Sequence, residues 1–294
     1  FGDLFGIARD AEGNIYFADR ANHCIRKIDA QTKLMTTAVG TGALGFRVNV
    51  LATQAVFRTP IDLVFDQEGH LYITDIGNAC IFRVDAVTKM VTKVAGGVNA
   101  RGFEDGSLLT AKFNSPEGID VDSQGNLYVA DVGNHRIRKI DLQTQTVITV
   151  AGNGTASSEI NDGLVATQAS LYTPTDVVVD AAGNLYIADR LHYRVRKVDA
   201  VSQKISTIAG TGSISGSNND GGLAVEASLR TPRFLALDLD QNLYISTSSR
   251  LHQVNLTNNI IHTVVRGLFG KIPENGELAI NSGIYPRGEI GRAS

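Results

Sequence analysis

One phrase recurs five times along the chain, and this repetition restricts the possible folds more than any other feature. Residues 125–131 read Gly-Asn-Leu-Tyr-Val-Ala-Asp, and closely similar phrases occupy residues 13–19, 69–75 and 183–189. A diverged copy occupies residues 241–247. The central tyrosines stand at positions 16, 72, 128, 186 and 244, so they are 56, 56, 58 and 58 residues apart. Such a regular period predicts an array of equivalent structural units.

Each unit contains four short apolar segments that predict β-strands. In the third unit they fall at residues 118–121, 127–130, 137–140 and 147–151, are rich in Val, Ile and Tyr, and are separated by turn residues. The first turn ends at Gly125, which can adopt the positive φ of a hairpin turn. Four antiparallel strands per unit, repeated around an axis, are typical of a β-propeller blade. The expected fold class is therefore all-β, with five complete four-stranded blades.

A second recurring segment resembles the signature of a known family. Residues 131–141 read Asp-Val-Gly-Asn-His-Arg-Ile-Arg-Lys-Ile-Asp, and related segments occupy residues 19–29, 75–85 and 189–199. These segments resemble the NHL repeat, and the resemblance covers about residues 4–265. It implies a propeller, commonly of six blades. It does not imply one activity, because that family includes a peptide-amidating lyase, RNA-binding modules, and sensor or adhesion ectodomains.

The repeat boundaries predict one propeller domain over residues 1–294. Blades are expected at about residues 4–40, 60–97, 116–152, 174–210 and 232–266. Residues 284–286, Ile-Tyr-Pro, match the segments that precede the other blades, so residues 267–294 are expected to hold an inter-blade loop and the start of a further blade. We favour a fragment of a six-bladed or larger ring over closure with five blades. A missing blade would expose strands and blade faces that proteins normally cover.

Composition excludes several classes of protein. The chain carries 27 positive and 30 negative residues, a net charge of −3, which argues against a nucleic-acid partner or an anionic membrane surface. It has no apolar run long enough to predict a membrane-spanning helix. Its two cysteines exclude a disulfide-rich scaffold, and their equivalent positions in two blades lie too far apart for a bond. We expect Cys24 and Cys80 to be unpaired, inert thiols.

One face of the ring is expected to carry the binding site. Because strands alternate in direction, the links between blades emerge on the same face as the turn between the second and third strands. These links are long and differ in sequence, as binding loops on a rigid scaffold do. We expect a protein or glycan partner there, although loops that only cap the grooves between blades are the simpler alternative. The expected binding residues are Asp105, Asp162, Asp220, Asn134, His135, Arg190 and His192.

Acidic residues also suggest a metal site in the central channel. Strand alternation places Asp62, Asp120 and Asp176 on the channel side of the innermost strand in three successive blades, with Glu117 near the mouth. Oxygen ligands of this kind would suit Ca²⁺, the one cofactor that the sequence suggests. Solvated carboxylates in a wet channel are the alternative. A metal here would favour a different function, a metal-dependent hydrolase or lyase acting at the channel mouth.

Polar residues that recur in several blades are expected to serve the blade, since an active site needs one asymmetric constellation. The repeated aspartates are expected to accept hydrogen bonds from their own hairpins. The repeated arginines are expected to pair with local acids. His23 and His135, which recur at one hairpin position, are expected to secure the turn. The aspartates are Asp19, Asp75, Asp131 and Asp189, and the arginines are Arg26, Arg83, Arg138 and Arg196.

These patterns favour a non-catalytic binding or assembly module built on a rigid propeller. The resemblance to bacterial multi-repeat NHL proteins, together with Gly/Ser/Asn-rich loops such as residues 210–219, predicts a location outside the cell or in the cell envelope. The segment is expected to be part of a larger chain or assembly. A third possibility is a spacer that joins other domains and has no ligand. Fold alone does not choose among these functions.

Overall fold

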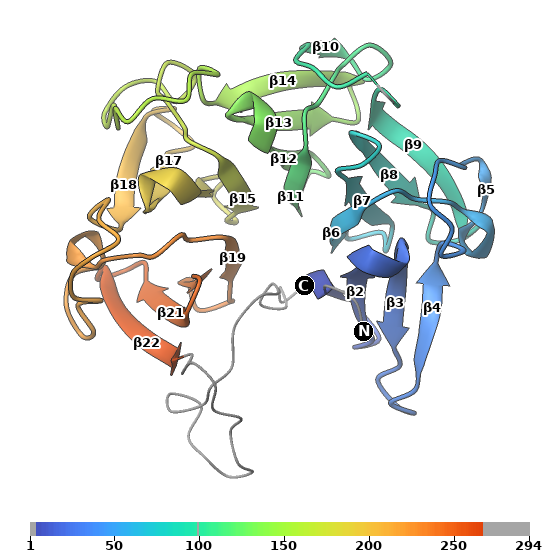
Figure 1. Cartoon of the computed structure of the whole chain (residues 1–294), viewed down its shortest axis with the longest axis horizontal. Helices are drawn as coiled ribbons and strands as arrows, with labels where there is room; N and C mark the ends of the chain where they lie inside the picture. Colours follow the sequence, from blue (N-terminus) through green and yellow to red (C-terminus); the bar gives the residue numbers. More distant parts are fainter. Residues whose placement is uncertain (1–3, 99, 267–294) are drawn as a thin grey trace.

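A computed structural model of the chain describes residues 4–98 and 100–266. These residues form five antiparallel sheets that follow one another around a common axis (Figure 1). Within each blade the four main strands follow chain order from the axis outward. The predicted all-β propeller with five four-stranded blades is confirmed. None of the described helices is long and apolar enough to cross a membrane.

Each blade takes its four strands from one continuous stretch of the chain. Blade 1 contains β1 (Leu4–Arg9), β2 (Ile15–Asp19), β3 (Cys24–Ile28) and β4 (Met35–Val39). Blade 2 contains β6 (Pro60–Phe65), β7 (Leu71–Asp75), β8 (Cys80–Val84) and β9 (Met90–Gly96). Blade 3 contains β11 (Pro116–Val121), β12 (Leu127–Asp131), β13 (Arg136–Asp141) and β14 (Thr146–Ala151). Blade 4 contains β15 (Pro174–Val179), β16 (Leu185–Asp189), β17 (Arg194–Val198) and β18 (Ile205–Ala209). Blade 5 contains β19 (Phe234–Leu237), β20 (Asn242–Ser246), β21 (Arg250–Asn255) and β22 (Ile260–Arg266).

Short helical turns lie in the loops. Three follow the second strand of a blade and two lie in the links between blades. In chain order they are η1 (Arg20–Asn22), η2 (Ala52–Gln54), η3 (Val132–Asn134), η4 (Arg190–His192) and η5 (Ala224–Glu226). We call the side of the ring with the links and the turns after each second strand the loop face. The opposite side, with the other two turns of each blade, is the tight-turn face.

The links add short strands that the sequence did not predict. β5 (Val50–Leu51) pairs with the outer strand β9, and β10 (Gly106–Ser107) pairs with β14. Single bridges from Val165 and Leu223 occupy the corresponding places in blades 4 and 5. Each link therefore first runs along the outer strand of the next blade and then turns inward to the axis. This path fastens each of blades 2 to 5 to the link before it.

The apolar core lies mainly between blades. Val64 and Tyr72 of blade 2 pack against Ile119, Leu127 and Val147 of blade 3, so each blade buries a face on its neighbour. Blade 1 differs, because no described blade precedes it. Ile15 and Met35 are 37% and 36% exposed, whereas the apolar residues at the same repeat positions in blades 2 to 5 are buried.

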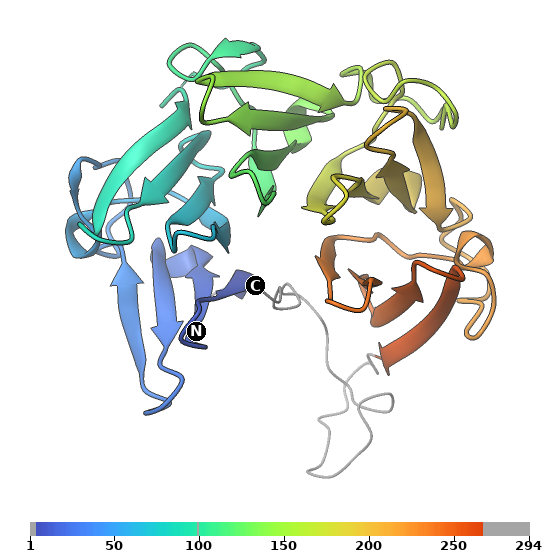
Figure 2. The same cartoon turned by 180° about the vertical axis from the view of Figure 1, so that it is seen from behind.

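Blades 5 and 1 meet only near the axis in the described part of the chain. The rings of Phe5 on β1 and Phe234 on β19 lie edge to face with centroids 6.3 Å apart. Away from the axis the described strands leave a wider interval between these two blades than between any other neighbours (Figure 2). The predicted start of a further blade at residues 284–286 lies outside the described residues.

The backbone at the first turn of blades 1 to 4 has the positive φ that the glycines predict. The repeated glycines adopt φ values between 80° and 85°, in the region that residues with a Cβ atom rarely occupy. They are Gly13, Gly69, Gly125 and Gly183. In blade 5 Gln241 holds the same place with a φ of 63°, which costs conformational energy. This agrees with the divergence of the fifth copy seen in the sequence.

Candidate functional site

The repeated aspartate at the end of each second strand organises the loop face. Asp131 accepts a hydrogen bond from the side-chain amide of Asn134 in its own hairpin, at 2.7 Å. It also accepts the backbone amide of Asn114 in the incoming link, at 2.7 Å. Asp75 and Asp189 likewise accept backbone amides from their links. The predicted role in the hairpin is confirmed, and the structure extends it to the link.

Arg138 makes a buried charge network with two aspartates. Its fully buried guanidinium lies 3.0 Å from Asp131 and 2.5 Å from Asp105. It also donates to the carbonyls of Glu104 and Lys112, so its hydrogen-bonding capacity is well used. Burial raises the pKa of Asp131 to about 6, although Asn134 and Arg138 act in the opposite direction. Asp105, an expected binding residue, therefore holds the link onto the blade.

Blade 4 repeats this network, and blade 5 keeps part of it. Arg196 lies 3.2 Å from Asp189 and 2.6 Å from Asp162. Asp220 accepts the backbone amide of Thr263 on β22. At all three link aspartates the geometry favours the simpler alternative, a loop that caps the groove between blades.

Arg83 was placed wrongly among the repeated arginines. Arg138 pairs with Val129 across the ladder, and the residue in the same register of blade 2 is Phe82, opposite Ile73. Arg83 is one position further along and faces the other side of the sheet, opposite Tyr72. A shift of one residue moves a side chain to the opposite face. The shift is visible in the sequence, because Arg83 stands eight residues after its hairpin aspartate and Arg138 stands seven after its own.

The expected binding histidines also have structural partners. The Nδ1 of His192 lies 2.6 Å from Asp189, and its Nε2 lies 2.6 Å from the carbonyl of Ser157 in the link. In this way it takes the place that Asn134 occupies in blade 3. His135 adopts a φ of 53°, and its Nδ1 accepts the backbone amide of Thr173. Burial lowers the pKa of His135.

The channel aspartates fasten adjacent blades to one another. Asp62 accepts the backbone amide of Ile119 in the next blade, at 2.8 Å. Asp120 accepts Val179 of the next blade at 2.9 Å, and Asp176 accepts Leu235 at 2.7 Å. Asp62 and Asp176 are buried, so solvated carboxylates are the wrong description for these two.

Two glycines make room for these carboxylates. A Cβ atom at Gly118 would lie 2.1 Å from an Asp176 oxygen, and one at Gly6 would lie 2.3 Å from an Asp62 oxygen. The alternation of glycine and aspartate around the axis therefore has a steric cause. Across residues 4–98 and 100–266, no group of three or more His, Cys, Asp or Glu side chains is placed to hold a metal ion. The geometry favours blade-to-blade fastening over the expected Ca²⁺ site.

The mouth of the channel on the loop face gathers three arginines that sequence reasoning did not bring together. Burial raises the pKa of Glu117, and the charges of Arg233, Arg190 and Arg20 oppose that rise. The guanidinium carbons of Arg20 and Arg233 lie 5.2 Å and 4.9 Å from the centroid of the Phe5 ring. We call Arg20, Arg190 and Arg233 the arginine cluster. Arginines in such a setting suit carboxylate or phosphate groups. The available signal was that Arg20 and Arg190 both directly follow the hairpin aspartate of their blade.

Exposed apolar side chains lie beside the hairpins of the same face. Leu44 and Phe103 are 63% and 44% exposed, and the guanidinium carbon of Arg136 lies 3.9 Å from the Phe103 ring centroid. The carbonyl of Gly102, next to Phe103, accepts a hydrogen bond from the Asn134 hairpin, which fixes the position of this link. Aromatic residues and arginine together are typical of protein–protein contact surfaces.

The cysteines agree with prediction. Cys24 and Cys80 are free and buried. Burial raises the pKa of the Cys80 thiol to about 12, and it also raises the pKa of Cys24. Neither thiol is activated for chemistry near neutral pH.

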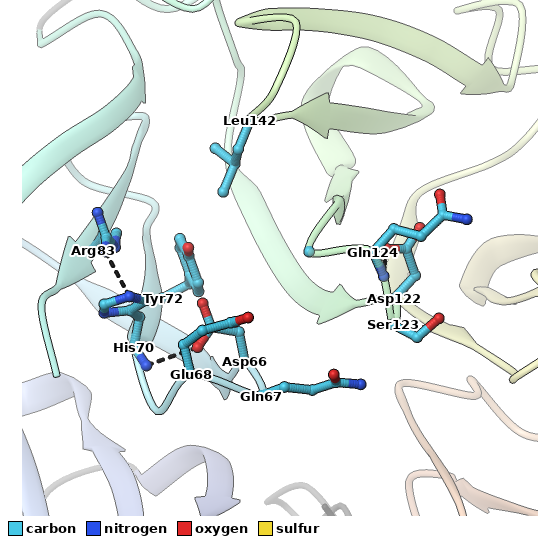
Figure 3. A pocket seen from close by; sticks show the side chains of 11 residues that line it. Asp66, Gln67, Glu68, His70, Tyr72, Arg83, Asp122, Ser123, Gln124 and Leu142 are labelled. Carbon is cyan, nitrogen blue, oxygen red and sulfur yellow. Dashed lines mark hydrogen bonds between the residues drawn. The ribbon is translucent and has the colours of Figure 1, made fainter.

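A cleft that the sequence did not predict lies on the tight-turn face between blades 2 and 3 (Figure 3). Its volume is about 310 Å³. The first turns of the two blades supply opposite walls, and Tyr72, Arg83 and Leu142 complete the lining. Its lining combines carboxylates, an arginine and a histidine, so it can both donate and accept hydrogen bonds.

Comparisons with known proteins agree with the architecture. The NHL repeat family matches residues 113–140. The chain is 27% identical over 255 residues to protein SUPPRESSOR OF QUENCHING 1, chloroplastic, of Arabidopsis thaliana, covering 83% of this chain and 24% of that protein. It is 36% identical over 129 residues to human NHL repeat-containing protein 2, covering 43% of this chain and 17% of that one. It thus spans well under half the length of these relatives.

Two further similarities concern enzymes and the fold. A probable peptidyl-alpha-hydroxyglycine alpha-amidating lyase of Caenorhabditis elegans is 33% identical over 97 residues, covering 33% of this chain and 26% of that protein. A chain in a crystal structure of a nidogen/laminin complex superposes with a TM-score of 0.60 and 15% identity, covering 88% of this chain and 78% of that one. At that identity the structural likeness supports the fold alone.

Proposed function

We propose that this chain, an NHL-repeat β-propeller, is a non-catalytic binding module whose loop face engages a protein partner. The observation that carries the proposal is the combination of exposed Leu44 and Phe103 with the arginine cluster on one face. The contact would be apolar along the links and would meet acidic groups of the partner at the channel mouth. The proposed setting is extracellular or in the cell envelope.

Physical chemistry favours this surface over the link aspartates. Asp105 and Asp162 are engaged by buried arginines, so withdrawing either of them for a partner would leave a buried guanidinium with only one of its two carboxylates. Leu44 and Phe103 lose exposed apolar area when a partner covers them, at a gain of roughly 25 cal/mol per Å². Arginine is also over-represented among the residues that dominate protein interfaces.

Affinity capture with matched variants tests the proposal. The purified chain would be immobilised, and proteins retained from an extract of the source cells would be quantified by mass spectrometry. We expect the Leu44→Ser, Phe103→Ser double variant to lose the specifically retained partner. The control is Val87→Ser with Val201→Ser, which changes exposed apolar residues on the tight-turn face. Equal retention by both double variants, with unchanged melting temperatures, would contradict the proposal.

A glycan partner and a lyase activity are second candidates. The observation that favours the lyase is the similarity to the Caenorhabditis elegans protein over 97 residues, together with the partly buried Glu117 at the channel mouth. If the chain is a metal-dependent hydrolase or lyase, purified protein should hold a stoichiometric metal ion. Metal analysis by plasma mass spectrometry tests this directly, and the variant Glu117→Gln should then lower the metal content.

A further inference from the structure

We propose that the cleft between blades 2 and 3 on the tight-turn face binds a small neutral saccharide, with Asp66, His70 and Arg83 as its hydrogen-bonding residues. This site is separate from the loop face, where the protein partner is proposed. Three observations carry the inference: a break in the repeat, two side-chain donors that face each other, and a mixed polar lining.

The repeat is broken at His70. In every other blade an asparagine holds this position and donates its side-chain amide at 2.8 Å to the aspartate four residues earlier; these are Asn14, Asn126, Asn184 and Asn242. Histidine keeps one function of the asparagine, since its Nδ1 accepts the backbone amide of Ala86 at 2.9 Å, as Asn14 accepts Ala30. It does not supply the other function, the side-chain hydrogen bond to the aspartate four residues earlier. Asp66 keeps the backbone amide of His70 but has no side-chain amide donor at the oxygen that the asparagine bonds elsewhere.

The repeat is broken again at Arg83, which lines the same cleft. The corresponding residues of blades 1, 3 and 4 are Lys27, Lys139 and Lys197, each with its ammonium 5.7 to 5.9 Å from the centroid of the repeat tyrosine ring. Arg83 instead extends its guanidinium to 2.7 Å from the Nε2 of His70 and 3.1 Å from Asp85. Two departures from the repeat that meet in one cleft indicate a local function.

The contact between His70 and Arg83 leaves room for an acceptor. Because Nδ1 accepts the amide of Ala86, the proton of the neutral imidazole belongs on Nε2. That N–H then faces a guanidinium N–H, and two donors cannot satisfy each other. A ligand oxygen placed beside both nitrogens would accept from each. Asp66, on the same wall, would accept a hydrogen bond from a ligand hydroxyl in the place of the missing asparagine donor.

The lining selects the chemical class of the ligand. Figure 3 shows Asp66, Gln67 and Glu68 on one wall and Asp122, Ser123 and Gln124 on the other, with the Arg83–His70 pair beside the first. An anion would meet the carboxylates on both walls, and a cation would meet Arg83. A sugar hydroxyl both donates and accepts, so a neutral polyhydroxylated ring can satisfy both kinds of group. The volume of about 310 Å³ is at the lower end of small-ligand pockets, which suits a small saccharide.

Binding of simple sugars to the intact chain tests the inference. Saturation-transfer NMR and calorimetry would use glucose, galactose, mannose, N-acetylglucosamine and their disaccharides, with acetate, phosphate and choline as charged probes. We expect at least one neutral sugar to bind and the charged probes to fail. The variants His70→Asn and Arg83→Lys restore residues that the fold already carries in other blades, so they should fold normally. Each should weaken binding by about tenfold or more.

Matched substitutions in another blade separate the site from a general effect. Asn184→His and Lys197→Arg copy the blade 2 residues into blade 4 and should leave sugar affinity unchanged. Failure of every neutral sugar to bind, preference for a charged probe, or full binding by His70→Asn would each overturn the inference. These variants lie on the tight-turn face, so they should retain the loop-face partner as the unchanged chain does. The sugar-binding and partner-capture experiments can therefore fail independently of each other.

Discussion

Blades 2 and 3 fill the same buried site on the third strand with different side chains. At the same position of the third strand, blade 3 has the buried Arg138 and blade 2 has the buried Phe82. Arg138 is balanced by an aspartate of the hairpin and another from the link. The link before blade 2, residues 40–59, contains no Asp or Glu, and Phe82 packs there against the rings of Phe46 and Phe57.

Blade 5 is intermediate between these two. His252 holds the arginine position and is buried, Asp220 remains in the link, and Thr247 replaces the hairpin aspartate. The link before a blade thus supplies an aspartate where this position is Arg or His, and it supplies none where the position is Phe82. Either an ion network or an aromatic residue therefore fills this site. In blade 2 the buried hairpin aspartate Asp75 is satisfied by amide donors in place of an arginine.

Loss of the network in blade 3 should have the largest effect. Arg138→Leu leaves Asp131 buried without its counter-ion, which should lower the free energy of unfolding by about 3–5 kcal/mol. Denaturant titration measures this. Lys139→Leu, on the same strand, is the control and should cost about 1 kcal/mol or less. Equal losses of unfolding free energy in the two variants would mean that the buried charge network does not stabilise blade 3.

The histidine of blade 5 should make stability depend on pH. Burial lowers the pKa of His252 to about 4, below the ordinary value of 6.5. Between these values the folded state binds fewer protons than the unfolded state, so stability should decrease as the pH falls from about 6.5 to 4. The loss is about 3 kcal/mol in total. His252→Phe, which copies blade 2, should flatten the pH dependence in this window, and an unchanged profile would contradict the assignment.

A transplant of the charge network into blade 2 probes the same difference from the other side. Phe82→Arg alone should destabilise the chain, because its link offers no acid. Adding Val48→Asp, at the link position that corresponds to Asp162 of blade 4, should recover part of the loss. A double-mutant cycle should give a favourable coupling of about 1–3 kcal/mol. A coupling near zero would show that matching acids to the arginine position is incidental.

The smallest effect concerns the exposed side of blade 1. Ile15→Ala should cost about 1 kcal/mol or less, because Ile15 is partly exposed. Leu127→Ala, at the same repeat position in blade 3, should cost about 2–5 kcal/mol. Melting curves of the two variants measure the difference. Similar losses would indicate that the outer side of blade 1 is covered in solution.

The period of the sequence was enough to predict the blades, their turns and the unpaired cysteines, because these depend on local chemistry within one repeat. Contacts between repeats could not be derived in this way. The bonds from Asp62 and Asp176 to the next blade depend on how closely the inner strands approach the axis. The strands β5 and β10 depend on the path of the links. The misplacement of Arg83 is of another kind, because its spacing from the hairpin aspartate Asp75 already places it opposite Tyr72.

The candidate sites also divide into residues that recur in several repeats and residues that meet only in the folded ring. The link aspartates expected to bind a partner recur from blade to blade, and the structure uses them to hold the ring. Arg190 stands at a variable repeat position, where Val132 stands in blade 3, and His70 interrupts the repeat. Both lie where binding is proposed. A single sequence shows such interruptions but not which of them meet in space, so the arginine cluster and the cleft required coordinates.

A paired experiment separates the residues that hold the ring, which recur from blade to blade, from residues at variable positions that are proposed to bind. Melting temperature and capture of the loop-face partner would be measured for Asp162→Asn and Arg190→Gln in parallel. We predict that Asp162→Asn lowers the melting temperature and retains the partner, and that Arg190→Gln keeps the melting temperature and loses the partner. The reverse pattern would contradict this division of roles.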